Sequence, residues 1–344
     1  KINPMLNQEE IEKIKVLLSV KKKIVITTHY NPDGDAMGSS LGLYHYLKSK
    51  KHNVCVITPN SWPSFLDWMP GVSSCLAGDK HLKKAAKLLE EADIVFSLDY
   101  NSLKRTNDLA EFIQASKGVK MMIDHHIQPD NYADFTYSDI KASSTCEMIY
   151  EFIQSLEENF NISQECAECL YTGIMTDTGS FKYSATTSKT HLVAAELINK
   201  GARNTYIHHK LFDTNTYERM RLLGFCLSEK LTVLNDYHTA FIALTSQELE
   251  SFNYKKGDTE GIVNYALSIG EINFSAIFIE RDDEIKISFR SKGNFDVNSF
   301  ARNHFEGGGH QNAAGGKGLD TMDETIMKFI QLLPQYKQLL AIHE

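Results

Sequence analysis

The chain has 344 residues, of which 42% are hydrophobic and 23% charged, and it carries a formal net charge of -8. At roughly 150 residues per domain, this length predicts two domains whose cores need no disulfide bonds. The acidic balance disfavours binding to long duplex nucleic acid, because proteins that bind it neutralise its phosphates with a basic surface. The six cysteines are scattered, no apolar run approaches the ~20 residues that span a bilayer, and the first residues do not resemble a signal peptide. We therefore expect a cytoplasmic protein that has no membrane partner.

Short runs rich in Val, Ile and Met alternate with helical patterns in the first half of the chain. We expect strands at 23–28, 53–58, 93–98 and 119–123, and helices at 36–49, 81–91 and 108–116. Strands separated by helices are typical of βαβ units, whose parallel sheet is covered on both faces. Helices then dominate from 144 to 200, and the polar residues 143–145 are expected to cap the first of them.

The second half of the chain has a different pattern, in which strands and helices are mixed. We expect a strand at 237–245, a helical segment at 258–268, a hairpin of strands 272–280 and 284–290 that turns through 281–283, and helices at 296–304 and 323–333. Three consecutive glycines at 307–309 break this regularity. The predicted fold class is α/β, with a parallel-sheet domain at 1–200, a helical linker at 201–230 and a smaller α+β domain at 231–344.

Acidic and histidine side chains follow several of the predicted elements, at the point where each element ends. Ligands of an open α/β sheet bind at the carboxyl ends of its strands, so these positions converge on one crevice. A single Asp after a strand is usually a turn or a helix cap, but recurrence at four positions favours a site. The residues are His29, Asp33 and Asp35 after the first strand, Asp99 after the third, Asp124, His125 and His126 after the fourth, and Asp177 at the end of an apolar helix.

These residue types indicate metal ions. Imidazole nitrogens and carboxylate oxygens without thiolates suit a hard or borderline divalent ion such as Mn2+ or Mg2+. One ion does not need so many ligands, whereas two ions about 3.5–4 Å apart that share a carboxylate do. Such a pair lowers the pKa of a bridging water and stabilises the attacking and leaving oxygens of a phosphoryl transfer. The constellation therefore predicts two ions and phosphoester chemistry.

The order of these residues resembles that of the DHH phosphoesterases, and within them the nanoRNase and pAp phosphatase family. The resemblance extends over nearly the whole chain. The triplet 124–126 alone is a weak signal, but an ordered set of five motifs is a strong one. The motifs are His29 to Asp35, Asp99 followed by Arg105, Asp124-His125-His126, Thr176 to Gly179, and the Gly-rich segment 307–316, which resembles the signature of the DHH-associated substrate domain.

The resemblance implies a role for each site residue in the first domain. Asp99 bridges the two ions and is one of two catalytic residues. The other, His126, is expected beside the scissile phosphate, where it donates a hydrogen bond to the phosphate or assists the leaving group. Asp124 is expected to orient a ligand histidine. The implied ligands, with Mn2+ favoured over Mg2+ by the histidines, are His29, Asp33 and Asp99 for one ion, and Asp35, Asp99, His125 and Asp177 for the other.

The same resemblance assigns substrate binding to the C-terminal domain. Backbone N–H groups of small residues form anion-binding concavities, which suits a phosphate at Gly308 and Gly309 with His310 alongside. Arg290 ends a predicted strand and matches the family's phosphate-binding arginine, whose planar fork fits phosphate. The alternatives are a flexible loop at the glycines and an exposed arginine without a ligand. Arg105 fits a salt bridge that supports the loop of Asp99 as well as it fits a substrate contact.

The resemblance implies a manganese-dependent phosphoesterase. Its substrates are short oligoribonucleotides, dinucleotides such as pApA, and 3′,5′-bisphosphorylated nucleosides such as pAp, and its products are nucleoside monophosphates. Alternatives within the superfamily are a cyclic-dinucleotide phosphodiesterase and a single-strand exonuclease, although the processive exonucleases are usually larger; a family II pyrophosphatase has a basic C-terminal signature instead. A nucleotide sensor that binds without cleaving would lack a metal ligand, and no ligand is missing here. The oligomeric state is left open, with a homodimer as one option.

Overall fold

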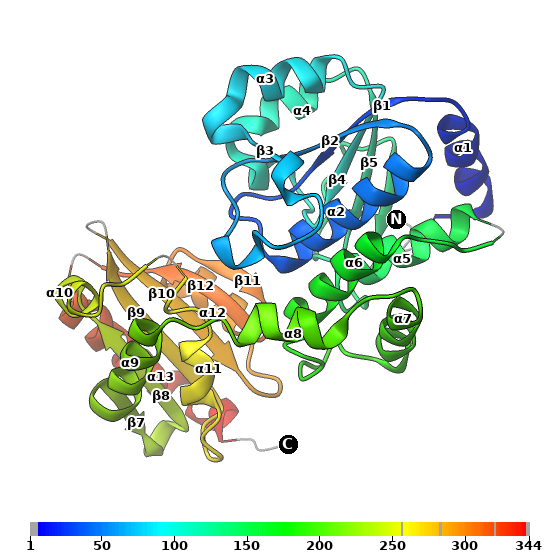
Figure 1. Cartoon of the computed structure of the whole chain (residues 1–344). Helices are drawn as coiled ribbons and strands as arrows, with labels where there is room; N and C mark the ends of the chain where they lie inside the picture. The colour runs from blue at the N-terminus through cyan, green and yellow to red at the C-terminus, as the bar shows by residue number, and fades with distance from the viewer. Residues whose placement is uncertain (1–5, 158, 256, 282–283, 320, 342–344) are drawn as a thin grey trace. The chain divides into compact units, whose positions relative to one another are not determined.

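The computed structural model describes residues 6–157, 159–255, 257–281, 284–319 and 321–341. The chain forms two compact units, one ending at Thr214 and the other beginning at Asn215, and each is built on its own six-stranded sheet (Figure 1). The segment 201–230, expected as a linker, contributes α8 (Asn204–Phe212) to the first unit, and α9 (Tyr217–Phe225) and the π-helical turn η4 (Cys226–Lys230) to the second.

All the strand pairs described in the first unit are parallel, which confirms the predicted α/β architecture of this half of the chain. The strand order is β3-β2-β1-β4-β5-β6, so the order reverses between β1 and β4. Two strands are absent from the sequence-based prediction, because β3 and β6 have only two and four residues. The strands are β1 (Lys23–Thr27), β2 (Asn53–Thr58), β3 (Leu76–Ala77), β4 (Ile94–Leu98), β5 (Val119–Asp124) and β6 (Phe135–Ser138).

Successive residues of the central strands belong to different hydrophobic cores, one on each face of the sheet. Ile24 and Ile26 of β1 pack into one core and Val25 into the other, which explains the continuous Val and Ile runs of the sequence. The second face is covered by α3 (Gly78–Glu90), η3 (Leu103–Leu109) and α4 (Ala110–Ala115) (Figure 1). The first core is built by α1 (Gln8–Leu18), α2 (Gly34–Ser49), α5 (Thr145–Leu156), α6 (Gln164–Asp177) and α7 (Ser188–Asn199), with η1 (Ser64–Leu66) and η2 (Val72–Ser74).

Helix α2 approaches α6 closely, because Gly34, Gly38 and Gly42 recur at intervals of four residues along its α6 side. A Cβ atom at Gly38 would lie 2.6 Å from the carbonyl oxygen of Cys169 and 2.9 Å from the Sγ atom of Cys146. Only glycine fits this contact without displacement of a neighbour. The contact fixes the position of the first turn of α2 relative to α6.

The second unit is a smaller α+β domain, as predicted, with a mixed sheet of order β11-β12-β10-β9-β8-β7. Among its described strand pairs, β8–β9 is parallel and the others are antiparallel. The expected hairpin is present as β9 and β10, and the last two residues of its expected turn at 281–283 lie outside the described residues. The strands are β7 (Leu231–Leu234), β8 (Thr239–Leu244), β9 (Phe274–Arg281), β10 (Glu284–Ser291), β11 (Gly308–His310) and β12 (Ala313–Lys317).

Phenylalanine side chains fill one core of the second unit. The ring centroid of Phe274 lies 4.9 Å from that of Phe295, 5.1 Å from that of Phe300 and 5.4 Å from that of Phe329, which are favourable separations for tilted aromatic pairs. The aromatic core includes residues of α12 (Val297–His304) and α13 (Met322–Leu340). A second, aliphatic core includes residues of α9, α10 (Ser246–Ser251) and α11 (Ile262–Leu267), and η5 (Asn235–Tyr237) joins β7 to β8.

Within the described residues, no helix is both long enough and apolar enough to cross a membrane.

Several parts of the second unit differ from the sequence-based prediction, which lacked β7 and α10, and glycine explains two of the differences. The segment expected only to break regularity forms β11, which pairs with β12 although Gly and Ala have low strand propensity. A Cβ atom at Gly309, whose φ is +155°, would lie 2.4 Å from the carbonyl oxygen of Ala313, so the strands pair because side chains are absent. Helix α11 begins later than the helix expected from 258, because Gly261 precedes it with a φ of +80°.

We expect Gly38→Ala to lower the free energy of unfolding by about 1–3 kcal/mol, the usual cost of overpacking a closed contact. Gly224→Ala is the matched control, because Gly224 lies within α9 and a Cβ atom there would meet nothing within 4 Å. The control should be as stable as the unmodified chain or slightly more stable. Thermal unfolding followed by circular dichroism measures both variants, and an unchanged Tm for Gly38→Ala would contradict the close contact.

Candidate metal centre

The six residues expected to bind metal come together in the first unit, at the carboxyl edge of its sheet. Strands β1 and β4 flank the point where the strand order reverses, which is where open α/β sheets bind ligands. Each of these residues stands at or near the end of a helix or strand, which restricts its position. His29 follows β1, Asp33 caps α2, Asp35 lies in the first turn of α2, Asp99 follows β4, His125 follows β5, and Asp177 ends α6.

Asp99 lies between two groups of ligand atoms. Its Oδ2 atom is 3.4 Å from Nε2 of His29, and its Oδ1 atom is 3.6 Å from Nε2 of His125. The residue is buried, and its backbone has a φ of +64°, a conformation that residues other than glycine rarely adopt. The two oxygens of one carboxylate are thus directed at two different histidines.

The first group consists of His29, Asp33 and Asp99, whose ligand atoms all lie within 4.8 Å of one another. Nδ1 of His29 is 2.8 Å from the carbonyl oxygen of Tyr30. Since a carbonyl oxygen only accepts hydrogen bonds, Nδ1 carries a hydrogen, so Nε2 is the ring nitrogen that faces the two carboxylates and that would coordinate an ion after losing its proton. Oδ1 of Asp33, 3.9 Å from that Nε2 atom, also accepts the backbone amides of Asp35 and Ala36 as the cap of α2.

The second group consists of Asp35, His125 and Asp177, again within 4.8 Å. Nε2 of His125 lies 3.5 Å from Oδ2 of Asp177 and 3.9 Å from Oδ2 of Asp35, while Nδ1 faces the carbonyl oxygen of Ala142 at 3.2 Å. Two ligand atoms that are each ~2.1 Å from one ion lie roughly 3.0–3.4 Å from each other. The donor types and separations in both groups therefore fit divalent metal ions after small adjustments.

The charges of these side chains shift one another's pKa values strongly. Burial raises the pKa of Asp177 to about 7, and repulsion from Asp33 and Asp99 adds to this effect. The charge of His125 lowers the pKa but does not cancel the rise. Burial and the carboxylates of Asp99 and Asp177 also raise the pKa of Asp35 well above its usual range. The site therefore holds more negative charge than its own cations neutralise, a situation that a bound divalent ion would relieve.

The histidines and Asp99 show the complementary effect. Burial lowers the pKa of His29 and of His125, but nearby aspartates outweigh it and raise both values to about 9. For His29 the main opposing contribution is its hydrogen bond with Asp99, and for His125 it is the charge of Asp177. Burial alone would raise the pKa of Asp99, but the hydrogen bond with His29 and the charges of the three histidines hold it below its usual range.

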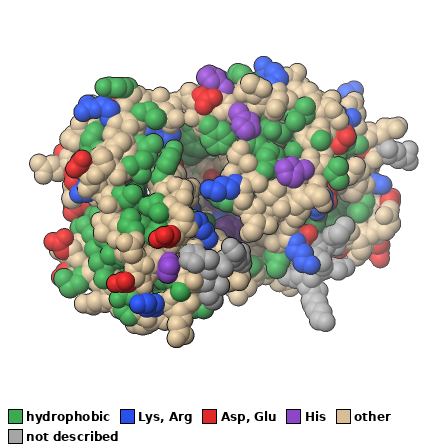
Figure 2. Space-filling model, turned by 90° about the horizontal axis from the view of Figure 1, so that it is seen from below, with side chains coloured by type: hydrophobic (Ala, Val, Ile, Leu, Met, Phe, Trp, Pro, Cys, Tyr) green, Lys and Arg blue, Asp and Glu red, His purple; other side chains and the backbone are tan. Residues whose placement is uncertain are grey.

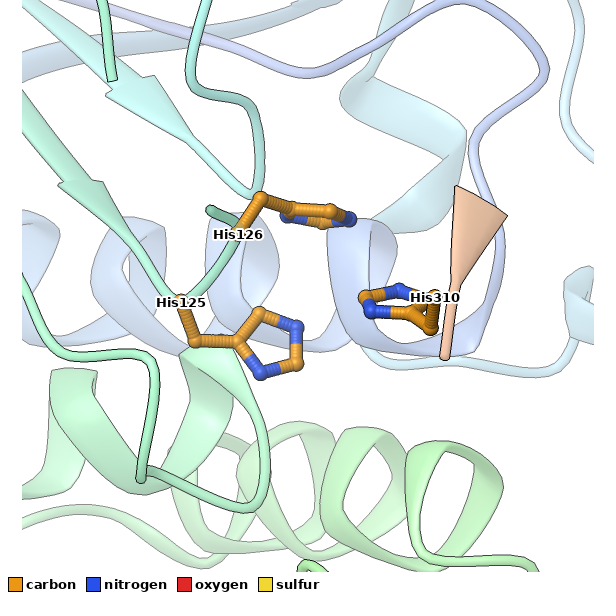
Figure 3. A group of neighbouring side chains, drawn as sticks. All are labelled: His125, His126 and His310. Carbon is orange, nitrogen blue, oxygen red and sulfur yellow. The ribbon is translucent and has the colours of Figure 1, made fainter. Parts of the chain in front are cut away.

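His126 is held by Asp124 and also lies near Asp99, whose Oδ1 atom is 3.7 Å from the Nδ1 atom of His126. The fully buried Asp124 carboxylate accepts the backbone amide of His126 at 3.0 Å, and its other oxygen lies 2.7 Å from Nδ1 of the same residue. The rings of His125 and His126 leave successive positions at the end of β5 and meet edge to face (Figure 3). We expected Asp124 to orient a ligand histidine, and the histidine that it contacts is His126 instead of His125.

The residues expected to bind substrate lie in the second unit, on neighbouring strands of its sheet. Arg290 of β10 and His310 of β11, which is also drawn in Figure 3, are both paired with Ala313 of β12. Directly opposed residues of antiparallel strands point to the same face, so the three stand in one row across the sheet. The side chains of Arg290 and His310 therefore project from the same face of the sheet, on either side of Ala313.

The glycine strand is tied to α12 through Asn298. The backbone amide of Gly309 donates a hydrogen bond of 2.9 Å to Oδ1 of Asn298, which also accepts Nε of Arg302 at 3.0 Å. A phosphate bound to the amide of Gly309 would have to displace Asn298. Arg302 lies beside Gly308, since a Cβ atom there would be 3.6 Å from Nε of Arg302. No motif of the sequence singles out Arg302, so its position beside the glycines is new information.

Arg105 connects two loops of the first unit through its backbone. Its carbonyl oxygen accepts the backbone amide of Tyr30 at 2.6 Å, which joins the segment after β4 to the loop after β1. Among the described residues it forms no ion pair, so the salt bridge that was one of its two alternatives is absent there, and the support that Arg105 gives to this region comes from the main chain. On the face seen in Figure 2, Lys and Arg side chains are scattered among acidic and uncharged ones.

Comparisons with known proteins cover both units. Residues 23–174 match the DHH family, N-terminal domain, and residues 236–338 match the DHHA1 domain. The chain is 31% identical over 303 residues to the bifunctional oligoribonuclease and PAP phosphatase NrnA of Bacillus subtilis (strain 168), over 87% of this chain and 90% of that protein. A solved exopolyphosphatase-related protein from Bacteroides fragilis is 43% identical with a TM-score of 0.95, over 98% of this chain and 99% of that one. RecJ of Thermus thermophilus, solved with Mn2+, shares the fold at 12% identity and a TM-score of 0.52, over 99% of this chain and 55% of that one.

We expect divalent metal ions to displace protons from the site at pH 7.5. His29 and His125, with pKa values of about 9, are protonated at that pH in the metal-free protein, and each must lose its proton to coordinate an ion. Titration calorimetry with MnCl2 in buffers of different ionisation enthalpy measures this release, which should decline above a pH of about 9. His125→Gln should release fewer protons than the unmodified chain. A binding heat that is identical in every buffer would contradict the raised pKa values.

Proposed function

The chain belongs to the DHH family of phosphoesterases, hydrolases that act on phosphoester bonds, and on this premise we propose that it cleaves short oligoribonucleotides and 3′,5′-bisphosphorylated nucleosides such as pAp. The observation that carries the proposal is the position of Asp99, whose two oxygens face two groups of ligand atoms. Two ions that share a carboxylate are suited to in-line displacement at phosphorus. The name of the B. subtilis relative, oligoribonuclease and PAP phosphatase, supports the substrate class.

The two groups of ligand atoms are assigned to two Mn2+ ions that share Asp99. The mixture of imidazole and carboxylate ligands favours Mn2+ over Mg2+, which prefers an octahedral shell of oxygen ligands. When bound, the ions would supply Lewis acidity at the phosphate and lower the pKa of water. The ligands would be His29, Asp33 and Asp99 for one ion, and Asp35, Asp99, His125 and Asp177 for the other.

The hydrolysis adds water across one P–O bond. The water oxygen bonds to phosphorus, the bond to the leaving oxygen breaks, and the leaving oxygen takes up a proton. His126 is assigned to hydrogen-bond the phosphate or to supply that proton. Because Nδ1 is hydrogen-bonded to Asp124, the hydrogen that His126 offers would come from Nε2 of the protonated ring, and the Asp124 contacts keep the ring from turning.

The second unit is assigned to bind the nucleotide. Arg290 and His310 stand in one row across its sheet and offer the donors that a phosphate group requires. Gly308 and Gly309 have no side chain of their own that would keep a ligand from their backbone, and a phosphate would take the place of Asn298 at the amide of Gly309. The net charge of -8 supports short substrates, because long polymers need an extended basic surface.

Product analysis tests the substrate class. With Mn2+, the protein should form nucleoside monophosphates from pAp, pApA and the shortest members of an RNA ladder, and should leave long RNA intact. Selective opening of cyclic di-AMP would support a cyclic-dinucleotide phosphodiesterase instead. Cleavage of polyphosphate alone would support the activity for which the B. fragilis protein is named. Metal binding without cleavage of any of these compounds would refute the substrate class.

Asp99→Asn tests the shared carboxylate. We expect turnover of pAp to fall by more than about 100-fold, because an amide is a poor bridge between two cations. This loss exceeds the roughly 10–100-fold loss that is typical when a residue hydrogen-bonded to a metal ligand is removed. Asp108→Asn changes an exposed carboxylate of η3 in the same way and should keep the original turnover. An Asp99→Asn variant that retains a tenth of the original turnover would argue against a bridging role.

Arg290→Gln tests the phosphate contact in the second unit. A hydrogen bond between charged partners contributes about 1.5–3 kcal/mol, so the KM for pAp should rise roughly 10-fold or more, with a smaller change in kcat. Arg281→Gln is the control. Arg290 pairs with Ser275 near the start of β9, whereas Arg281 is the last residue of β9 and its guanidinium lies over the ring of Tyr254. Steady-state kinetics compares the variants, and an equal KM for both would remove Arg290 from the substrate site.

A further inference from the structure

The first turn of α5 contacts ligands of both groups through one residue, Thr145. The hydroxyl group of Thr145 donates a hydrogen bond of 3.0 Å to Oδ1 of Asp99. Its backbone amide donates one of 2.6 Å to Oδ2 of Asp35, and the next amide, that of Cys146, donates one of 2.9 Å to Oδ1 of Asp35. Thr145 therefore holds the carboxylate proposed to be shared and a carboxylate proposed to bind one ion.

These hydrogen bonds lie in the interior of the unit. The exposed fraction is 0% for Thr145, 1% for Asp35 and 2% for Asp99. A hydrogen bond to a carboxylate is stronger in such surroundings than in water, and the partial positive charge of a helix N-terminus favours the charged form of Asp35. Since a carboxylate oxygen accepts, the Thr145 hydroxyl is the donor, and its direction is fixed.

The same helical turn is anchored to a second helix by Glu147. Oε2 of Glu147 accepts hydrogen bonds from Ser143 at 2.5 Å and from Thr190 at 2.8 Å, and Oε1 lies 3.1 Å from Nζ of Lys189. Thr190 and Lys189 belong to the first turn of α7. Movement of Thr145 would therefore disturb the contacts of this turn with Asp35 and Asp99 and its contacts with α7. The hydroxyl group of Thr145 is thus held in place where it contacts Asp99.

We propose that Thr145 is a positioning residue that sets the orientation of the Asp99 carboxylate and, with it, the spacing of the two ions. The inference rests on the proposed two-ion function and adds to it a residue that is not one of the predicted metal ligands. The oxygen that Thr145 holds, Oδ1, is the one that faces His125, whereas Oδ2 faces His29. The ion of the His125 group should therefore depend on Thr145 more than the ion of the His29 group.

Thr145→Val tests the hydroxyl, because it keeps the shape of the side chain and the amide that binds Asp35. Titration calorimetry with Mn2+ should show one ion bound as in the unmodified chain and the other bound about 10–100-fold more weakly, as for loss of an outer partner of a metal ligand. The Mn2+ EPR spectrum should change from that of a coupled pair toward that of isolated ions. The kcat for pAp should fall with little change in KM, and Thr145→Ser should restore all three properties.

Thr172→Val is the matched control. Thr172 is a buried threonine of α6 in the same unit, and its hydroxyl donates to the carbonyl oxygen of Glu168 at 2.7 Å. This variant should bind two ions as the unmodified chain does. If Thr145→Val binds both ions with unchanged affinity, the inference is overturned.

The comparison of Thr145→Ser with Thr145→Ala decides the matter if Thr145→Val does not fold. Both variants lack the methyl group and differ only in the hydroxyl, so equal metal binding by the two would also overturn the inference. Metal binding is measured without substrate. An unmodified chain that binds two ions but cleaves no nucleotide would therefore refute the proposed substrates and leave the role of Thr145 standing.

Discussion

The first unit depends on a concentration of negative charge that is held away from water. Asp35 and Asp99 are buried, Asp177 lies beside them, and a carboxylate in such a place is costly unless hydrogen bonds or positive charge compensate it. The chain provides two forms of compensation, which are the histidines that face these carboxylates and the amides at the start of α5. The raised pKa values of Asp35 and Asp177 indicate that this compensation is incomplete. The strand order, the helix caps and the glycine contact keep like charges together at distances that suit bound cations.

Unusual backbone conformations gather at the same edge of the sheet. Residues other than glycine with positive φ cost about 1–3 kcal/mol each and persist where their surroundings determine them. In Asp99 this conformation coexists with a hydrogen bond of 3.1 Å from its amide to the carbonyl oxygen of Ile123, so the main chain stays in register while the carboxylate turns toward both histidines. In the segments that follow β1, β4, β5 and α6, the residues with this conformation are Asn31, Asp99, Gln128, Ser180 and Phe181.

Much of this arrangement could be predicted from the sequence, and the remainder could not for physical reasons. Strands buried on both faces require apolar runs, and the ligands at their ends form motifs whose order a family resemblance can match. Pairing of β11 with β12 depends on close backbone approach, for which Gly and Ala give no strand-like pattern. Thr145 looks like an ordinary first residue of a helix, because its partners Asp99 and Asp35 are 46 and 110 residues away. Adjacency in the chain likewise does not tell whether His125 or His126 turns toward Asp124.

The glycine contact between α2 and α6 connects helix packing to metal selectivity. Asp35 belongs to the first turn of α2 and Asp177 is the last residue of α6, so the distance between these carboxylates follows the separation of two helix backbones. Packed helices differ in separation by as much as ~2 Å, whereas the distances of metal ligands are fixed within ~0.2 Å. Mg2+ demands near-ideal octahedral geometry at about 2.0–2.1 Å, and larger divalent ions accept longer and less regular shells. A change of one methyl group at the helix contact, at a residue outside the proposed metal ligands, would therefore be expected to alter which divalent ion binds at the proposed centre.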